Sequence, residues 1–278
     1  MNLKQYRVDG NGSWKLDKHD PKDTDGCADK IEARKRLEGL RPEIIELQRR
    51  LYAGNTHGLL IVLQGLDAAG KDGTIRHVLS GVNPQGVHVS SFKVPSAVEA
   101  AHDYLWRIHH SAPARGRFNV FNRSHYEDVI AVRVHADKIL PDWARERENL
   151  WDERYEQINN FEKLLNQNNI HIIKIFLNIS HDEQRRRLQR RLDDPARNWK
   201  FSSSDLPERA LWDQYQVAYE QAFKHTSTDF APWYIIPSDK KWFRDLVIAE
   251  LVVRALRELK LEYPKADATL LEKVKVVN

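Results

Sequence analysis

The sequence predicts an α/β fold in three layers, in which a parallel sheet is covered by helices on both faces. Five short apolar segments of strand type alternate with stretches of helical periodicity, which is the pattern of a parallel sheet with crossover helices. These strand candidates are residues 59–64, 87–93, 118–121, 171–179 and 233–236. A glycine-rich turn directly follows the first of them, at the edge where such sheets bind ligands. The 278 residues contain no clear linker and fit one large domain with additions.

The first 53 residues are expected to form an arm and a helix that pack on a core formed by residues 54–278. The first 30 residues are polar and rich in Asp, Lys and Gly, which favours an irregular arm rather than a packed element. Apolar residues at helix-like intervals then predict a helix over residues 30–52. These residues are Ile31, Leu37, Leu40, Ile44, Leu47 and Leu51. Pro42 lies within this stretch and is a residue type that kinks or divides helices.

Composition and charge indicate an ordinary globular protein. Hydrophobic residues make up 41% and charged residues 30% of the chain, and the net charge is only +4. Cys27 is the single cysteine, which excludes an internal disulfide and fits a reducing compartment. The segment MNLKQYRVDG lacks the apolar core of a signal peptide, and no apolar run approaches the roughly 20 residues of a membrane span. We therefore expect a cytoplasmic protein that has no membrane partner.

Residues 65–74, GLDAAGKDGT, are the most informative stretch of the chain. They follow the apolar run LLIVL and match the pattern G-x-x-x-x-G-K. When this pattern lies between a strand and the start of a helix, its backbone N–H groups and its lysine lie together at the helix N-terminus. A chain of phosphates can bind there. The residues expected to bind phosphate here are Gly65, Ala68, Ala69, Gly70, Lys71, Asp72, Gly73 and Thr74. The alternative is an ordinary turn between a strand and a helix, since the pattern also arises by chance.

Two aspartates in this loop depart from the usual pattern. Asp72 stands where such loops normally have Ser or Thr to ligate magnesium, and Asp67 lies within the loop itself. A carboxylate beside phosphate is repelled unless a cation lies between them or a proton is transferred, so Asp67 is either a Mg²⁺ ligand or a base. Metal ligation is favoured if the acceptor is itself a phosphate, because such an acceptor needs no base.

Polar side chains also follow the strand candidate at residues 118–121. Asn122, Arg123, Glu127 and Asp128 come at or beyond its carboxyl end, although the two acids lie six or seven residues past the strand instead of at its tip. This is where phosphate-binding α/β folds place a magnesium carboxylate. Arg123 can bridge phosphate oxygens and stabilise charge in the transition state. Alternatively, the acids cap a helix that begins near residue 124, with Arg123 as their surface partner.

Residues 180–200 form an arginine-rich segment in which seven basic and four acidic side chains give a net charge of +3. Ser180 and Glu183 match a capping box and predict a helix directly after the preceding strand. A cationic helix that ends in a proline-containing turn is typical of nucleotide-kinase lids, which close over phosphates and exclude water. We expect such a lid at about residues 181–206. The alternatives are a solvated charged helix face and a site for nucleic-acid backbone.

Histidine and tryptophan are expected to have mainly structural roles. Five of the twelve histidines fall between residues 102 and 135, but none has metal-ligand spacing, so no zinc site is expected. Most of the tryptophans are expected to anchor the core or an interface. Trp199, near the lid, is the one that could line a nucleotide pocket.

Seven motifs together resemble the polyphosphate kinase 2 family, namely GLDAAGKDGT, GVNPQGV, SFKVPS, DYLWRIH, FNRSHYEDV, RLDDPARNWKFS and APWYIIP. The resemblance extends from about residue 52 to residue 242. It implies a thymidylate-kinase-like P-loop core that transfers a phosphoryl group between inorganic polyphosphate and a nucleotide, with Mg²⁺ or Mn²⁺. It also implies a homo-oligomer, either a dimer or a tetramer. The form HYEDV is most similar to the subgroup that phosphorylates both nucleoside monophosphates and diphosphates.

The resemblance also implies roles for individual residues. By position, Asp67, Lys71 and Asp72 would be functional residues of the loop, Arg123 a phosphate-binding arginine and Asp128 a magnesium-site carboxylate. Some members have an acid where this chain has Asn122, so the resemblance leaves open which carboxylate completes the metal site.

The expected reaction is reversible, in-line transfer of the terminal phosphoryl group of polyphosphate to AMP or ADP, and to GMP or GDP. The expected catalytic residues are Asp67, Lys71, Arg123 and Asp128. Of these, Asp67 and Asp128 are expected to hold the metal. The residues expected to bind the nucleotide are Asn122, Arg123 and Glu127. A long polyanion needs a long cationic groove, for which the candidates beyond the loop are Arg76, Lys93, Arg133, Arg187 and Arg191.

Two other functions stay open from the residues alone. An ATP-dependent nucleotide or small-molecule kinase would share the loop and the lid, and a test with polyphosphate as sole donor distinguishes it. A non-enzymatic polyanion-binding protein would share the basic residues but has no evident use for carboxylates among phosphates. Removal of the metal distinguishes this case, because activity would be lost while polyanion binding would persist. Nucleic acid is not expected as a partner.

Overall fold

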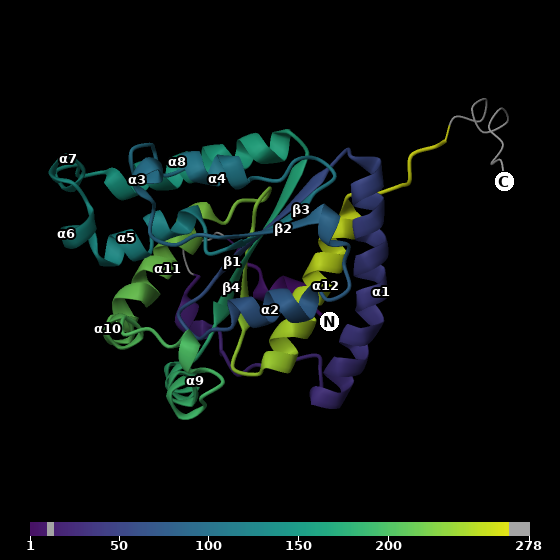
Figure 1. The fold of residues 1–278 in the computed structure, drawn as a ribbon, viewed down its shortest axis with the longest axis horizontal. Helices are drawn as coiled ribbons and strands as arrows, with labels where there is room; N and C mark the ends of the chain where they lie inside the picture. The colour runs from purple at the N-terminus through teal and green to yellow at the C-terminus, as the bar shows by residue number, and fades with distance from the viewer. Residues whose placement is uncertain (10–13, 267–278) are drawn as a thin grey trace.

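A five-stranded parallel sheet forms the centre of the molecule in the computed structural model, which describes residues 1–9 and 14–266 (Figure 1). The strands are β1 (Gly58–Gln64), β2 (Val87–Ser91), β3 (Phe118–Asn122), β4 (Ile170–Asn178) and β5 (Trp233–Pro237). They pair in parallel in the order β2-β3-β1-β4-β5, which confirms the predicted α/β fold. Each strand end lies within two residues of its expected position.

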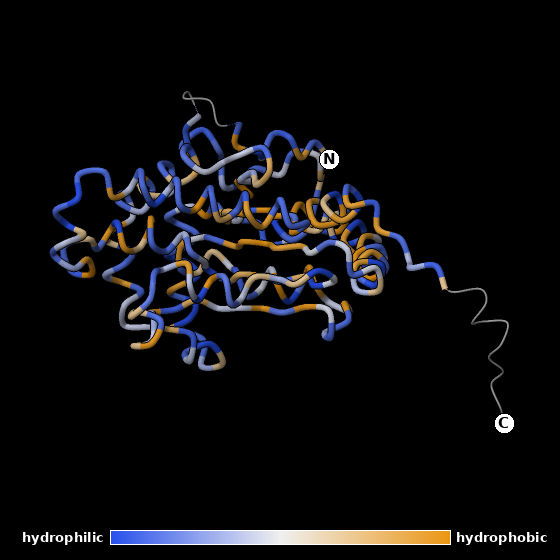
Figure 2. Tube along the Cα trace, turned by 90° about the horizontal axis from the view of Figure 1, so that it is seen from above, coloured by the Kyte–Doolittle hydropathy of each residue, from blue (hydrophilic) through white to orange (hydrophobic). Residues whose placement is uncertain are grey.

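Helices cover both faces of the sheet, with α1, α2 and α12 on one side and α8 and α11 on the other (Figure 1). Figure 2 shows the apolar strands as a layer between them, and every residue of β1 and β5 is buried. The α-helices are α1 (Lys30–Gly54), α2 (Lys71–Val78), α3 (Ala97–Ala100), α4 (Trp106–Ser111), α5 (Ala131–Val134), α6 (Ala136–Ile139), α7 (Asp142–Arg145), α8 (Leu150–Gln167), α9 (His181–Asp193), α10 (Asp205–Ala210), α11 (Trp212–Thr226) and α12 (Lys241–Glu258). Within residues 1–9 and 14–266, none of the helices is both long and apolar enough to span a bilayer.

The N-terminal arm lies against the core, although its polar composition alone favours an irregular arm rather than a packed element. It contains two 3₁₀ turns, η1 (Leu3–Tyr6) and η2 (Leu16–Lys18), and the side chains of Tyr6 and Val8 are 3% and 2% exposed. The backbone N–H of Val8 donates to the carbonyl of Trp233 at 2.9 Å, which attaches the arm to β5. Its few apolar side chains are widely spaced, so they show no periodicity, yet most of them are buried.

Helix α1 extends unbroken through Pro42, which therefore does not divide it. Asp29 caps its start by accepting hydrogen bonds from the N–H groups of Ile31 and Glu32. Ile31 was counted as part of the apolar face, but its side chain is 80% exposed because it lies in the first turn, beyond the surface that the helix covers. The other end stops at Asn55, whose φ of 49° is the left-handed conformation that often ends helices.

Strands β1, β3 and β4 end at the same edge of the sheet. Leu63 of β1 is paired with Asn122 of β3 on one side and with Ile175 of β4 on the other. Because all three strands run in parallel, the loops that follow them converge at their carboxyl ends. The three motifs singled out in the sequence therefore meet at one place.

A fully buried ion pair supports the loop that follows β3. Lys174 of β4 and Glu162 of α8 are both 0% exposed, and their charged atoms lie 2.5 Å apart. The Lys174 Nζ also donates to the Thr226 carbonyl at 2.7 Å and to the Tyr126 hydroxyl at 2.8 Å. Tyr126 belongs to η4 (His125–Asp128), the 3₁₀ turn that follows Arg123, so this network attaches that turn to β4 and α8.

Replacing Lys174 by methionine is expected to lower the free energy of unfolding by about 3–5 kcal/mol, because the buried Glu162 carboxylate would lose its lysine counter-charge and keep only its hydrogen bonds to His125 and Tyr126. Denaturant unfolding of the variant measures this loss. The matched control is Arg50→Met, which removes a half-exposed partner of Glu46 and is expected to cost less than about 1 kcal/mol. Equal losses from the two substitutions would contradict the assigned importance of the buried pair.

Candidate active site at the carboxyl edge of the sheet

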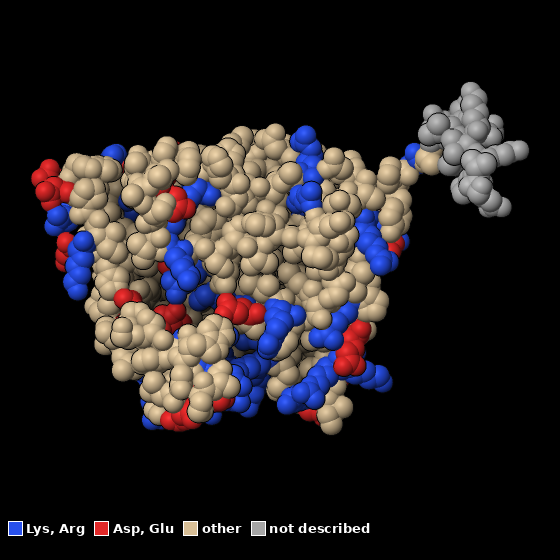
Figure 3. Space-filling view, viewed as in Figure 1, with Lys and Arg blue, Asp and Glu red and all other residues tan. Residues whose placement is uncertain are grey.

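A cleft of about 660 Å³ lies at this edge, between the loop after β1, the start of α2 and the segment from α9 to α10. Figure 3 shows lysine and arginine side chains gathered around the hollow between α2 and α9. The basic residues that line it are Lys71, Arg76, Lys93, Arg123, Arg187, Arg190, Arg191, Arg197, Lys200, Lys241 and Arg244, and the acidic ones are Asp67, Asp72 and Asp205. This space, called the basic cleft below, has the charge that attracts a polyanion.

The loop between β1 and α2 has a backbone suited to anion binding. Ala68 and Gly70 have positive φ angles of 63° and 113°, and Lys71 is the first residue of α2. A side chain at Gly70 would be strained at this φ, and Arg244 would have to move because its Nη1 would lie 2.0 Å from the added Cβ. The first N–H groups of a helix lack acceptors within the helix, and here they lie beside the basic cleft, where they can bind phosphate oxygens.

The Lys71 side chain lies over this loop. Its Nζ is 2.5 Å from the Gly65 carbonyl oxygen and 3.5 Å from that of Leu66. Burial, reinforced by the positive charge of Arg123, lowers the pKa of Lys71 to about 8. A bound phosphate chain favours the charged ammonium, so binding is expected to raise this pKa again.

The value of kcat/KM is therefore expected to fall as the pH rises through about 8, because Lys71 in the free protein loses its proton and its charge. The matching decline in kcat should occur at a higher pH, since bound phosphates oppose that proton loss. Rates measured across a pH series check both expectations. The guanidinium of Lys71→Arg stays charged, so the residual activity of this variant should not decline at alkaline pH. If the alkaline decline persists in Lys71→Arg, it arises from a group other than Lys71.

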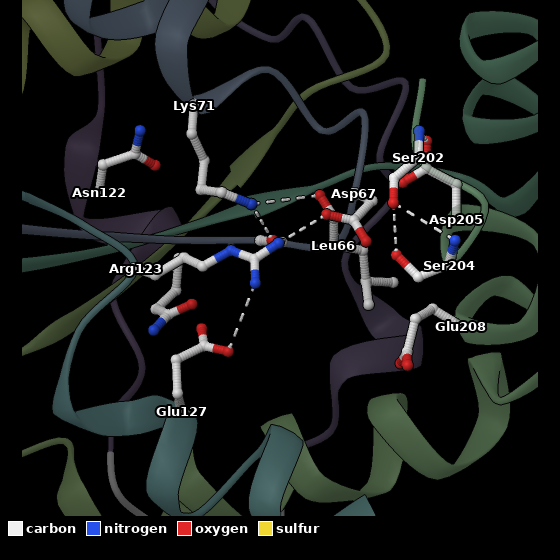
Figure 4. Close-up of polar contacts among 12 residues, drawn as sticks. Leu66, Asp67, Lys71, Asn122, Arg123, Glu127, Ser202, Ser204, Asp205 and Glu208 are labelled. Atoms are coloured by element: carbon white, nitrogen blue, oxygen red, sulfur yellow. Dashed lines mark hydrogen bonds and ion pairs between the residues drawn. The ribbon is translucent and has the colours of Figure 1, made fainter. Parts of the chain in front are cut away.

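Arg123 connects the loop after β1 to the turn after β3 (Figure 4). Its Nη2 donates to Asp67 Oδ1 at 2.8 Å, and its Nη1 lies 4.0 Å from Glu127 Oε2. Its backbone N–H donates to the Leu63 carbonyl at 3.1 Å, and its φ of 62° is rare for an arginine. The alternative interpretation made Arg123 a surface partner of Glu127, but Asp67 is the closer partner in the structure.

Asp72 has no direct contact with Asp67 or Arg123 among the described contacts and instead contacts Asn122 and Lys200. Its Oδ1 accepts a hydrogen bond from Asn122 Nδ2 at 2.9 Å, and its Oδ2 lies 3.8 Å from Lys200 Nζ. Asp72 is exposed, so it is available to a bound cation or to Lys200. The structure thus brings the first turn of α2, the end of β3 and the arginine-rich segment together.

Asp128 is placed differently from the other expected metal ligand. Asp67 lines the basic cleft, whereas the residues described as lining it do not include Asp128. Burial raises the pKa of Asp128 to about 6 against the opposing charges of Arg154 and Arg107. In the described parts of the chain, no three His, Cys, Asp or Glu side chains are grouped as a protein-only metal site.

The basic residues expected to bind phosphate fall into two groups. Arg76, Lys93, Arg187 and Arg191 line the basic cleft. Arg133 is not among the described residues that line it. Its guanidinium donates to the Tyr155 hydroxyl at 2.7 Å and lies 5.3 Å from the Trp151 ring centre. The aromatic partners were not recognisable from the sequence, because they lie about 20 residues away on α8.

The arginine-rich segment begins with only half of the expected capping box. The Ser180 hydroxyl accepts a hydrogen bond from the Glu183 N–H at 3.1 Å. The Ser180 N–H instead donates to Asp239 Oδ1 at 2.8 Å, while the Glu183 carboxylate pairs with two arginines of its own helix. At the far end of the segment Trp199 lines the basic cleft and is 76% exposed.

Two basic residues of the basic cleft were missed at the level of sequence. Lys241 and Arg244 lie in the first turn of α12, and Arg244 is 1% exposed. The Arg244 Nη1 donates to the Ala69 carbonyl at 3.1 Å, and its guanidinium also pairs with Asp245. The only signal was a charged pair at the start of an otherwise apolar helix, which periodicity alone assigns to the surface.

Comparisons with known proteins agree with this geometry. The family model for Polyphosphate kinase 2 (PPK2) matches residues 27–264. The chain is 46% identical over 273 residues to the AMP/ADP-polyphosphate phosphotransferase of Meiothermus ruber, covering 98% of this chain and 99% of the relative. It is 48% identical over 224 residues to the ADP-polyphosphate phosphotransferase of Rhodopseudomonas palustris, covering 79% and 78%. The crystal structure of Polyphosphate Kinase 2 from Arthrobacter aurescens TC1 matches with a TM-score of 0.88 and 41% identity, covering 97% of this chain and 96% of that one. The chain therefore belongs to the polyphosphate kinase 2 family.

Proposed function

We propose that this protein transfers the terminal phosphoryl group of inorganic polyphosphate to AMP and ADP, and to GMP and GDP. The observation that carries this proposal is the continuity of the basic cleft, which extends from Lys71 and Arg123 along α9 to Lys200. A single nucleotide would occupy only part of such a row of cations, whereas a long polyanion can contact all of it. The names of the Meiothermus ruber and Rhodopseudomonas palustris relatives support the same donor and acceptor.

The proposed mechanism is in-line transfer, in which the protein positions the reactants and stabilises charge. The N–H groups of the loop and Lys71 hold the phosphates at the start of α2. Arg123 is placed between the carboxylates of Asp67 and Glu127, where it can bind the transferred group and stabilise its developing charge. Asn122, the last residue of β3, and Glu127, in the turn that follows, are the proposed contacts of the nucleotide.

The cleft fits a magnesium ion that is completed by substrate. Mg²⁺ is usually held by one or two carboxylates together with phosphates and water, so a protein-only cluster is not required. Asp67 and Asp72 both line the basic cleft and supply carboxylate oxygens, while Asp128 would have to act from beside it. The bound ion would neutralise the charge of donor and acceptor phosphates. We propose Asp67 as the principal magnesium ligand. Asp128 is the proposed second ligand, and Asp72 is the alternative for that second position.

The proposal is tested by supplying polyphosphate as the sole phosphoryl donor, with AMP and ADP in parallel reactions. ADP and ATP formation is expected in both cases, and chelation of the divalent ion should abolish it. Transfer only from ATP would instead identify an ATP-dependent kinase. Polyphosphate binding that persists without any turnover would identify a polyanion-binding protein. A homo-oligomer remains part of the proposal, and light scattering of the purified protein checks it.

A further inference from the structure

We infer that Arg187 is a positioning residue that holds the phosphate-binding loop in shape, and that it does not itself bind polyphosphate. It was expected among the phosphate-binding arginines because it lies in the arginine-rich segment. The inference rests on the proposed function, since it assigns this residue a different task in the same reaction. Three features of the described contacts carry it.

The first feature is that every N–H donor of the Arg187 guanidinium is already used. Nε donates to Glu183 Oε1 at 2.8 Å. Nη1 donates to the carbonyls of Ala68 and Ala69 at 3.0 and 2.8 Å, and Nη2 to those of Ser238 and Asp239 at 2.6 and 3.1 Å. A guanidinium has five N–H donors, so these five contacts use all of them. The side chain is only 9% exposed, and a phosphate could bind it only by displacing protein acceptors.

The second feature is that α9 holds three consecutive carbonyls of the loop. Gln184, one turn before Arg187, donates its Nε2 to the Asp67 carbonyl at 3.1 Å. The N–H and C=O of a trans peptide point in opposite directions. Holding the carbonyls of residues 67–69 against α9 therefore turns the N–H groups of residues 68–70 away from α9. The Ala69 N–H donates to the Leu66 carbonyl at 3.1 Å, so the side chains of this helix fix the direction of the Ala68 and Gly70 N–H groups, which are proposed to receive phosphate.

The third feature is the backbone of Ala68. Its φ of 63° is left-handed, a conformation that is strained for a residue with a Cβ. Such a conformation persists only where its surroundings enforce it, and the Arg187 bond to the Ala68 carbonyl is one such restraint. Arg187 also joins this loop to the residues after β5, which fixes the loop against two different elements.

The test compares Arg187 with Arg190, an exposed arginine of the same helix that also lines the basic cleft. Lysine keeps a positive charge but cannot reproduce a five-donor fork. Arg187→Lys is therefore expected to lower kcat about 100-fold by displacing the loop. Its KM for polyphosphate should change less than about 3-fold, and the dependence of that KM on salt should be unchanged, because no phosphate contact is lost. Arg190→Ala, in contrast, should raise KM and weaken its salt dependence, because it removes an exposed charge of the basic cleft.

A kcat of Arg187→Lys that is nearly equal to that of the wild type would overturn the inference. So would a rise in KM with weaker salt dependence in Arg187→Ala, because that pattern marks a phosphate contact. Each rate is divided by the concentration of folded protein, and near-ultraviolet circular dichroism measures the folded fraction. If neither Arg187 variant folds, Gln184→Ala tests the same restraint, and a kcat equal to that of the wild type would overturn it. Wild-type protein that is inactive with polyphosphate would instead refute the proposed function.

Discussion

Replacing Lys71 by alanine is expected to lower the rate of phosphoryl transfer from polyphosphate about 10³-fold or more. The ammonium lies at the first residue of α2, beside the N–H groups that are proposed to hold the phosphates, so its loss removes charge from the transition state. The fold should be little affected, because in the described contacts Nζ donates only to two loop carbonyls. Initial rates of ATP formation from ADP measure the first effect, and thermal unfolding measures the second.

The control for Lys71→Ala is Lys163→Ala, which removes an exposed lysine of α8 that lies outside the basic cleft. Its rate should equal that of the wild type. Turnover by Lys71→Ala at the control rate would remove the proposed catalytic centre altogether.

Replacing Arg123 by alanine is the second change with a very large expected effect, a fall in kcat of about 10³-fold or more. Its guanidinium lies within 4.0 Å of both Asp67 and Glu127, so it is held at the point where the two loops meet. Arg123→Lys should recover little activity, because an ammonium cannot contact a carboxylate and two phosphate oxygens in one plane. Rates at saturating polyphosphate and ADP measure the loss in kcat.

The backbone of Arg123 provides the matched control. Its φ of 62° is left-handed, so alanine at this position also carries a strained backbone, whereas glycine does not. Arg123→Gly should therefore be more stable than Arg123→Ala and equally inactive. If glycine restores turnover, the loss in the alanine variant comes from the backbone, and the proposed role of the guanidinium is wrong.

Those parts of the fold that depend on local patterns were predictable. Because both faces of the sheet are covered, the runs that became β1 and β5 are continuously apolar and the apolar run of β4 is interrupted only by His171 and Lys174, and this made their positions clear. The glycine-rich loop was recognisable because the pattern and its preceding strand are adjacent in the chain. The packing of the N-terminal arm was not evident from its composition, because its buried residues contact β5 and α11, more than 200 residues away.

The candidate site was predictable only at the level of its segments. The sequence identified the three loops that meet at the carboxyl edge, but not which cations would face the cleft. Arg187 and Arg133 have the composition of phosphate ligands, yet the structure places them on carbonyls and on aromatic residues, respectively. Arg244 was missed because its partners, Ala69 and Asp245, come from a distant loop and from its own helix. These assignments depend on tertiary contacts that spacing does not encode.

The attachment of the N-terminal arm affects the order in which the protein can fold during synthesis. Val8 is hydrogen-bonded to Trp233 and Ser227, and Arg36 forms an ion pair with Glu250, so these residues contact residues that are made more than 200 positions later. These contacts cannot form until β5 and α12 have left the ribosome, and until then β4 also lacks its outer neighbour in the sheet. A nascent chain therefore has an unpaired edge on β4 and unburied aromatic residues until β5 has been made, the condition in which chaperones bind and aggregation begins.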